Sequence, residues 1–356
     1  MKRTTALLGI IFSVLGIFCI FIAIHLLPGY VTRPSQLLLS PITSILPTPY
    51  PELTIDQIFT TEKSLYDTSS TRWSLVVTGD IIPARSVNFG ATKRNDYLWA
   101  FSNIASLLSK GDITYTNLES PLLSTCPVTV EGMIFCGSTK HIEGLKSAGI
   151  DVVSFANNHI GNYGVKGIEE TKALLEKNGI LVNGIEGAVY TQIKGVKLAF
   201  LSYNEIGAKE PMVSWLDETV MKQEIIEAKK QADMVFVGMS WGIEYTDHPT
   251  DTQREIAKIA IDAGADMILG NHPHWVQGIE FYKGKLIMYA LGNTIFDQMW
   301  SEETKKGMIG IATFDGVKLI DMTFHPTYIV DYGQSTLMTG TKKEEMIEYM
   351  KRVSFR

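Results

Sequence analysis

Short apolar runs alternate with amphipathic stretches along most of the chain from Trp73 onward. The runs expected to form strands are residues 75–77, 113–115, 152–155, 198–201, 234–237, 267–269 and 286–289. Helical patterns lie between them at residues 99–108, 141–148, 165–177, 217–231 and 251–263. Thr250 and Gln253 have the spacing of a capping box at the start of the last of these helices. Strands and helices in alternation predict a layered α/β fold, and from Gly310 onward further strands and a short terminal helix should complete it.

The first part of the chain has a different pattern. Lys2 and Arg3 precede an uninterrupted apolar stretch from about Ala6 to Leu27, and about 20 apolar residues can cross a bilayer as a helix. No pair of small residues stands where a cleaved signal would end. We therefore expect residues 1–28 to be a transmembrane signal anchor, which makes the protein a single-pass protein of the cell membrane with its bulk outside the cytoplasm.

Residues 29–71 are rich in proline, serine and threonine. This composition predicts an extracytoplasmic linker, with a short helix near residues 55–59. Residues 72–356 are then the folded part of the chain, and a hydrophobic content of 45% with 20% charged residues is enough for a buried core. The net charge of -6 argues against a basic surface for nucleic acid, so we expect no nucleic-acid partner.

Cys126 and Cys136 lie ten residues apart in a segment without periodic pattern. Outside the cytoplasm such a pair can form a disulfide. Two free thiols are the alternative, and the sequence alone leaves both open. The spacing does not match a zinc-binding pattern.

Polar side chains follow the ends of the predicted strands again and again. They are Asp80, Glu119, Asn158 with His159, Ser240 with Glu244, His272 with His274, and Asn293. Ligands of layered α/β proteins gather at the carboxyl ends of strands, so these side chains could meet at one site. Carboxylates, an amide and imidazoles form a mixed oxygen and nitrogen set that suits a divalent ion of manganese, iron or zinc. Two such ions would polarise an ester and activate a hydroxide.

The order and spacing of six motifs resemble the CapA family of capsule and poly-γ-glutamate synthesis proteins, which is related to the calcineurin-like metallophosphoesterases. The matching stretches are "VTGDIIPAR", "TNLESPL", "AGIDVVSFANNHIGNYGVKGIEET", "SWGIEY", "AGADMILGNHPHWVQGIE" and "YALGNTIFDQ". The resemblance covers the chain from Trp73 to about Gln334. It implies that residues 72–356 form a CapA-like metallophosphatase-fold domain, a four-layer sandwich of two sheets flanked by helices.

The resemblance also implies roles for individual residues. The candidate metal ligands are Asp80, Glu119, Asn158, His272 and His274. His159 takes the place of the histidine that acts as general acid or stabilises the transition state in related phosphoesterases. Arg85 stands where the family has an arginine near the site, which suits an anionic substrate. Without that role, Arg85 could instead form a structural ion pair with Glu119.

Three positions depart from the pattern of the relatives. Ile82 occupies the place of the histidine in the Asp-x-His motif of the phosphoesterases. Ser240 replaces the first residue of a His-Trp-Gly-x-Glu motif, and Asn162 replaces an aspartate. Fewer ligands would weaken a two-metal site, so a single metal ion and a non-catalytic anion site are both alternatives.

The expected function is that of an accessory protein in the synthesis or export of capsule, poly-γ-glutamate or another anionic envelope polymer. Its partners would be that polymer and the membrane-bound capsule synthesis proteins. One alternative is an active metal-dependent hydrolase of a phosphoester or a γ-glutamyl polymer. Another is a structural envelope domain with a vestigial site.

Overall fold

The computed structural model describes residues 52–59, 70–185 and 187–355. The predicted anchor at residues 1–28 and most of the predicted linker lie outside the described residues. None of the helices within the described ranges is both long enough and apolar enough to cross a membrane. The short helix expected near residues 55–59 of the linker is present as α2 (Ile55–Ile58).

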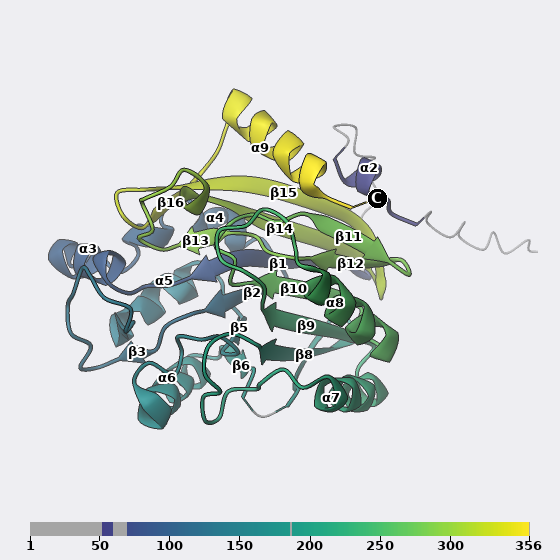
Figure 1. Cartoon of the computed structure of the whole chain (residues 1–356), viewed down its shortest axis with the longest axis horizontal. Helices are drawn as coiled ribbons and strands as arrows, with labels where there is room; N and C mark the ends of the chain where they lie inside the picture. The colour runs from purple at the N-terminus through teal and green to yellow at the C-terminus, as the bar shows by residue number, and fades with distance from the viewer. Residues whose placement is uncertain (1–51, 60–69, 186, 356) are drawn as a thin grey trace, which may run out of the picture. The chain divides into compact units, whose positions relative to one another are not determined.

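The first sheet combines a parallel and an antiparallel half. Its strand order is β16-β15-β14-β1-β2-β5-β6, and β13 also pairs with β1 (Figure 1). The strands are β1 (Arg72–Ile81), β2 (Ile113–Leu118), β5 (Val152–Ser154), β6 (Leu181–Asn183), β13 (Asn293–Ile295), β14 (Lys306–Asp315), β15 (Lys318–Val330) and β16 (Gln334–Leu337). Strands β1, β2, β5 and β6 are parallel, so their carboxyl ends lie at one edge.

The second sheet has the order β11-β12-β10-β9-β8-β7. Its strands are β7 (Val189–Ile193), β8 (Val196–Asn204), β9 (Met234–Ser240), β10 (Met267–Asn271), β11 (Ile279–Tyr282) and β12 (Lys285–Met288). The four central strands are parallel, and the edge strands β7 and β11 are antiparallel to their neighbours. A separate pair is formed by β3 (Leu122–Leu123) and β4 (Gly137–Ser138).

The two sheets face each other across the main core. Leu75 and Val77 of β1 point into this core together with Phe200 and Phe236 of the second sheet, whereas Val76 points to the opposite face. This alternation follows from the period of two residues in a strand. Consecutive apolar residues on β1 thus contact both cores, so both faces of the first sheet are buried at this strand.

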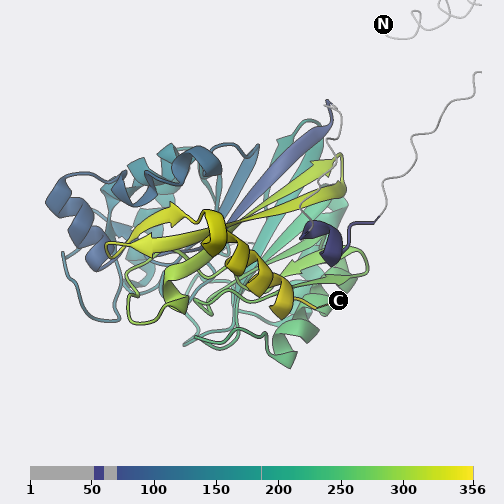
Figure 2. The same ribbon diagram turned by 90° about the horizontal axis from the view of Figure 1, so that it is seen from above.

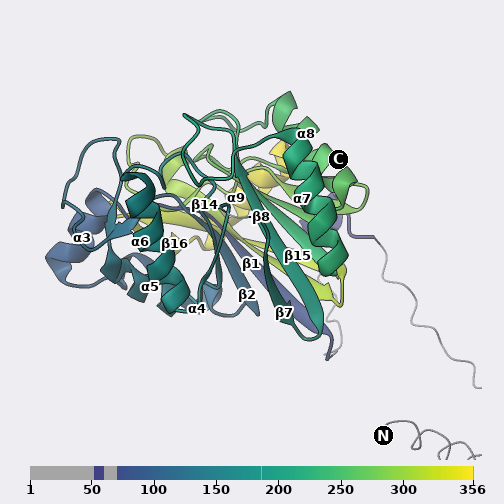
Figure 3. The same cartoon turned by 90° about the horizontal axis from the view of Figure 1, so that it is seen from below.

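Helices cover the two outer faces. Residues of α4 (Ala105–Leu108), α5 (Ile142–Ser147) and α6 (Gly164–Lys177) pack on the first sheet, and residues of α7 (Glu218–Gln231) and α8 (Asp251–Ala263) pack on the second. Figure 3 shows these two groups of helices on opposite sides of the strands. Helix α9 (Gly340–Val353) lies along β15 and adds Met346 and Met350 to the main core (Figure 2). The predicted arrangement of two sheets flanked by helices is confirmed.

The predicted helix at residues 99–108 is wrong as one continuous element. The chain forms a 3₁₀ turn η1 (Trp99–Phe101) and then the separate short helix α4. The carbonyl of Trp99 accepts hydrogen bonds from the Ser102 hydroxyl at 2.9 Å and from the Gln334 amide at 3.2 Å. The same carbonyl accepts the backbone N–H of Ser102 at 3.3 Å, which is the i→i+3 bond of a 3₁₀ turn and not the i→i+4 bond of an α-helix.

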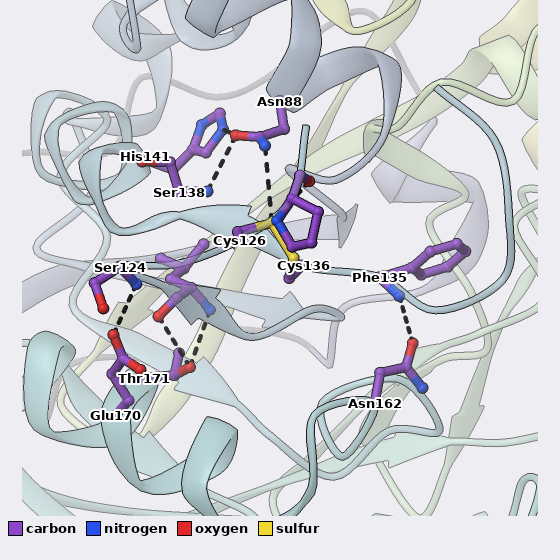
Figure 4. The surroundings of a disulfide bond; sticks show 12 residues. Asn88, Ser124, Cys126, Phe135, Cys136, Ser138, His141, Asn162, Glu170 and Thr171 are labelled. Carbon is purple, nitrogen blue, oxygen red and sulfur yellow. Dashed lines mark hydrogen bonds between the residues drawn. A yellow bond between two sulfur atoms is a disulfide. The ribbon is translucent and has the colours of Figure 1, made fainter. Parts of the chain in front are cut away.

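A disulfide joins Cys126 to Cys136, which confirms one of the two alternatives left open by the sequence. It closes a surface segment between β3 and β4, beside helix α3 (Ser86–Arg94). The side chain of Asn88 on α3 contacts Cys126 Sγ at 3.8 Å and accepts a hydrogen bond from the Ser138 backbone N–H at 3.0 Å (Figure 4). Both ends of the closed segment are therefore anchored to the same helix.

Candidate metal centre

Strands β1 and β2 bring two buried carboxylates together. Asp80 lies near the carboxyl end of β1, and Glu119 follows β2 directly. The side-chain amide of Asn117 donates to Asp80 Oδ1 at 2.9 Å and to Glu119 Oε2 at 3.1 Å. Asn157 in turn donates to Asn117 Oδ1 at 2.9 Å and so holds this amide in place. The predicted convergence of Asp80 and Glu119 is confirmed.

The two histidines of the second sheet meet these carboxylates. His272 and His274 lie in the loop after β10, and both have positive φ angles, of 91° and 59°. His274 Nδ1 is 3.0 Å from Asp80 Oδ2 and 2.9 Å from Asn293 Oδ1. Both partners are acceptors, because the Asn293 amide nitrogen donates elsewhere. His274 therefore carries a proton on Nδ1, and its Nε2 is the atom left for a ligand.

Three of the predicted ligands form a compact group. Glu119, His272 and His274 each offer one ligand atom, and these atoms lie within 4.8 Å of one another. Asp80 touches this group through His274. Direct metal ligation by Asp80 stays a prediction. Its contact with His274 Nδ1 is the kind by which a carboxylate orients a metal-binding histidine.

The donor set fits a bound cation. Two buried atoms of the group itself, Glu119 Oε1 and His272 Nδ1, have no hydrogen-bond partner within the described ranges, and the same holds for three atoms at or just after strand ends: Asn158 Oδ1, Ser240 Oγ and Asn271 Oδ1. Buried polar atoms are normally hydrogen-bonded, so unpaired atoms of this kind call for a partner that the protein itself does not supply. Each of these atoms can donate an electron pair, and the mixture of oxygen and nitrogen suits manganese, iron or zinc.

Burial and charge set the protonation of the group. Burial raises the pKa of Glu119 well above its usual range, and the nearby charge of Asp80 adds to the effect. Burial lowers the pKa of His272 to about 3. Burial would also lower the pKa of His274, but the hydrogen bond to Asp80 and the charge of Glu119 outweigh it and raise that pKa to about 9. Without a metal, a positive charge on His274 would thus balance Asp80, and a cation that binds there competes with protons.

His159 lies close enough to interact electrostatically with His272 and His274. Its Nδ1 is 3.1 Å from Asn162 Oδ1, and this oxygen also accepts the Phe135 backbone N–H at 2.6 Å. The oxygen of Asn162 cannot donate, so neutral His159 carries its proton on Nδ1 and leaves a lone pair on Nε2. Burial is the main cause that lowers the pKa of His159.

Arg85 is held by a carboxylate other than the one considered from the sequence. It forms a buried ion pair with Asp297, so the structural pair with Glu119 is wrong. The guanidinium carbon also lies 4.8 Å from the ring centre of Phe135 and 4.9 Å from that of Phe296. A role for Arg85 toward an anionic substrate stays a prediction.

The sequence signalled some of the remaining site residues only weakly and others not at all. Asn117 and Asn293 stand at strand ends, where an amide that orients a carboxylate or an imidazole could have been suspected. Phe135 lies in the disulfide-closed segment, which has no pattern that points to the site. Asp297 lies inside a matching motif but four residues beyond the strand end considered.

The sequence model of the bacterial capsule synthesis protein PGA_cap family matches residues 74–298, which include all of the site residues described above. The chain belongs to this family. The resemblance to CapA proteins is thereby confirmed. The chain is 35% identical over 248 residues to the PGA biosynthesis protein CapA of Bacillus subtilis strain 168, and the match covers 65% of each chain. It is 30% identical over 272 residues to the capsule biosynthesis protein CapA of Bacillus anthracis, and this match covers 70% of the chain and 66% of the relative.

This PGA_cap protein thus spans just under two thirds of the length of both relatives. Its fold is also similar to a crystal structure described as a novel phosphatase from Mycoplasma pneumoniae. The TM-score is 0.50 at 13% identity, and the match covers 77% of this chain and 96% of the other. At this identity the likeness concerns the fold alone, and it supports a phosphatase-like arrangement of the sheets.

Proposed function

We propose that this PGA_cap protein is an accessory protein in the synthesis or export of capsule, poly-γ-glutamate or another anionic envelope polymer. Membership of the family supports this role, as do the names of the two CapA relatives. We further propose that residues 1–28 anchor it in the cell membrane, with residues 72–356 on the extracytoplasmic side beside membrane-bound capsule synthesis proteins. The Cys126–Cys136 disulfide supports an oxidising compartment.

The proposal includes one divalent metal ion at the site. Glu119, His272 and His274 would hold it, and the unpaired buried atoms around them are the observation that carries this assignment. Ile82 stands where the phosphoesterases have a histidine, and Ser240 stands where CapA-like chains tend to have one, which favours one ion over two. When bound, the ion would supply a concentrated positive charge to anionic groups. Asp80 orients His274, and Asn117 fixes the carboxylates of Asp80 and Glu119.

Elemental analysis and polymer binding of the full chain test this role. The wild-type protein should retain about one zinc, manganese or iron ion per chain, and a His272→Ala/His274→Ala double variant should lose it. An accessory role predicts that binding to poly-γ-glutamate survives in the double variant. Loss of both polymer binding and capsule output in that variant would contradict the accessory role. A His248→Ala variant is the control, because this histidine is exposed and its side chain contacts Asp247, outside the metal group.

A metal-dependent hydrolase is the second candidate, and His159 is the observation that favours it. The bond to Asn162 leaves the Nε2 lone pair of His159 free to accept a proton, and burial keeps the imidazole neutral. After protonation, the same atom could deliver a proton to a leaving group. Cleavage assays on phosphodiesters and on poly-γ-glutamate with metal-loaded protein decide this point. Absence of turnover on both substrate classes would remove the hydrolase.

A further inference from the structure

The disulfide-closed segment, residues 126–136, contacts the site through one of its ends. We call it the disulfide loop. Its tip is exposed: Met133 and Ile134 are 64% and 66% accessible to solvent. The next residue, Phe135, is almost completely buried, and Cys136 follows it directly. The chain thus passes from solvent into the interior within one residue, immediately before the disulfide.

Phe135 and His159 are held by the same oxygen atom. The Phe135 ring stacks on the His159 imidazole with 4.1 Å between ring centres and 29° between ring planes. The backbone N–H of Phe135 and Nδ1 of His159 both bond to Asn162 Oδ1, at 2.6 Å and 3.1 Å. Phe135 therefore limits both the tilt of the imidazole and the orientation of the amide that fixes its proton. Figure 4 shows the hydrogen bond from the Phe135 backbone to the Asn162 side chain, with the disulfide of Cys136 nearby.

A second contact ties the disulfide loop to the other predicted catalytic residue. The Gly132 carbonyl accepts a hydrogen bond from Arg85 Nη1 at 3.1 Å. Phe135 also belongs to a small buried apolar cluster with Ile82, Ala84 and Phe296. Since Ile82 replaces a histidine of the phosphoesterases, apolar packing occupies this side of the site. The inner contacts of the disulfide loop thus reach both His159 and Arg85.

We infer that Phe135 is a positioning residue for His159, and that the Cys126–Cys136 disulfide keeps Phe135 in place. The disulfide fixes the residue next to Phe135 to the Asn88 anchor on α3, which restricts how far the ring can move away from the imidazole. A site works only when the orientation of its functional groups is fixed by their neighbours. The inference rests on the proposed function in one respect, namely that His159 serves the site.

Nuclear magnetic resonance of the full chain with ¹³C- and ¹⁵N-labelled histidine tests the inference at a fixed pH of about 8. A His159→Gln variant identifies the His159 signals. In the wild-type protein the stacked Phe135 ring should shift the His159 ring protons upfield, and the ¹⁵N pattern should be that of a single Nδ1–H tautomer. A Cys126→Ser/Cys136→Ser variant should lose the upfield shift and show a mixture of tautomers. Reduction of the folded wild-type protein gives the same test if the double variant does not fold.

Two further variants separate positioning from a general effect on the disulfide loop. Phe135→Leu should give the mixed tautomer pattern, and Phe135→Tyr, which keeps an aromatic ring, should restore the single one. Met133→Ala removes an exposed side chain of the same loop and should leave the His159 signals unchanged. Unchanged His159 signals after opening of the disulfide would overturn the inference.

The same samples distinguish this outcome from failure of the proposed function. Metal content is measured on the wild-type protein and on each variant. A wild-type protein that binds no divalent ion would contradict the proposed metal site, whereas the His159 signals would still report on Phe135. Conversely, if metal content is normal and the His159 signals are the same with the disulfide intact and opened, the positioning role alone is overturned.

Discussion

At the scale of single residues, His274 connects the parts of the site. Its Nδ1 faces Asp80 and Asn293, which belong to the first sheet, while its own loop follows β10 of the second sheet. One imidazole thereby links the two sheets at the site. Its free Nε2 joins Glu119 and His272 in the group that could hold a metal.

Replacement of Asp80 by asparagine should weaken metal binding by about 10- to 100-fold, which is the usual effect of losing a carboxylate behind a metal-binding histidine. The amide keeps the shape of the side chain but removes the charge that makes His274 a better electron-pair donor. Isothermal titration with Zn²⁺ or Mn²⁺ measures the change. Asp262→Asn is the matched control, because Asp262 pairs with Lys283 at the surface. Equal affinities for wild-type protein and Asp80→Asn would show that Asp80 does not act on the metal group.

A buried histidine away from the site should make stability depend on pH. Burial lowers the pKa of His141 to about 3, so the imidazole resists protonation. Its Nε2 donates a hydrogen bond to Asn88 Oδ1 at 3.1 Å. In the unfolded chain its pKa is about 6.5, so between pH 6.5 and 3 only the unfolded state gains the proton. The contribution of neutral His141 is complete above pH 6.5 and is lost as pH falls, by about 2 kcal/mol at pH 5.

Urea unfolding at pH 7.5 and at pH 5 measures this effect. In a His141→Gln variant, which retains a donor toward Asn88, the decrease between the two pH values should be smaller by about 2 kcal/mol than in the wild-type protein. The comparison isolates His141, since other histidines such as His272 titrate in both proteins. An identical pH dependence of the two proteins would show that His141 can be protonated without unfolding.

At the scale of elements, the start of α8 shows how local sequence fixes a boundary. Thr250 accepts the backbone N–H of Gln253 at 3.1 Å, and the Gln253 side chain accepts the backbone N–H of Thr250 at 2.9 Å. This is the capping box that the spacing predicts, and it is confirmed. The Gln253 amide also donates to Gln277 in the segment that follows His274, so the cap links α8 to the histidine loop.

Thr250→Ala should lower the free energy of unfolding by about 1 kcal/mol, the usual effect of removing such a cap. Thermal and denaturant unfolding measure it. Thr219→Ala is the matched control: Thr219 lies in the first turn of α7, is exposed, and leaves the cap to Asp217. The control should change stability by less than about 0.5 kcal/mol. A similar loss in both variants would mean that the Thr250 cap adds nothing of its own.

At the scale of the whole molecule, the two sheets approach each other closely at Gly238. A methyl group at this position of β9 would lie 2.1 Å from the hydroxyl of Tyr115 on β2 and 2.5 Å from that of Ser202 on β8. The two hydroxyls are themselves 3.0 Å apart and are buried. The absence of a side chain at Gly238 therefore lets Tyr115 and Ser202 form a hydrogen bond between the sheets. Tyr115 lies two residues before Asn117 on β2, and Gly238 lies two residues before Ser240 on β9.

Gly238→Ala should lower the free energy of unfolding by about 1–3 kcal/mol, because the added methyl group forces the sheets or the hydroxyls apart. Denaturant unfolding measures the loss. Tyr115→Phe in the Gly238→Ala background should recover part of it, since it removes the atom closest to the new methyl group. If the two substitutions instead add without any recovery, the contact between Gly238 and Tyr115 is not the cause.

The sequence by itself determined the order of most elements and the residues that reach the site. The apolar run on β1, the capping box of α8 and the polar residues at or after the ends of β1, β2, β5 and β10 are local patterns, and local patterns are visible in one chain. They sufficed for a layered α/β fold and for the convergence of Asp80, Glu119, His272 and His274, whereas the arrangement as two sheets flanked by helices was implied by the resemblance to CapA proteins. Helix α3 was not predicted because its residues lack a regular apolar face, and the helix predicted at residues 99–108 is divided into η1 and α4.

Only the tertiary structure decided which partners meet. Arg85 pairs with Asp297 rather than Glu119, and Phe135 stacks on His159 from a loop without pattern. Asp80 contacts His274 across 194 positions of sequence. Such pairs depend on how two sheets and a disulfide loop are packed, and no periodicity along the chain encodes a contact between side chains so far apart. The unpaired acceptors beside Glu119 and His272, which indicate a cation, become visible only when every buried polar atom has been placed.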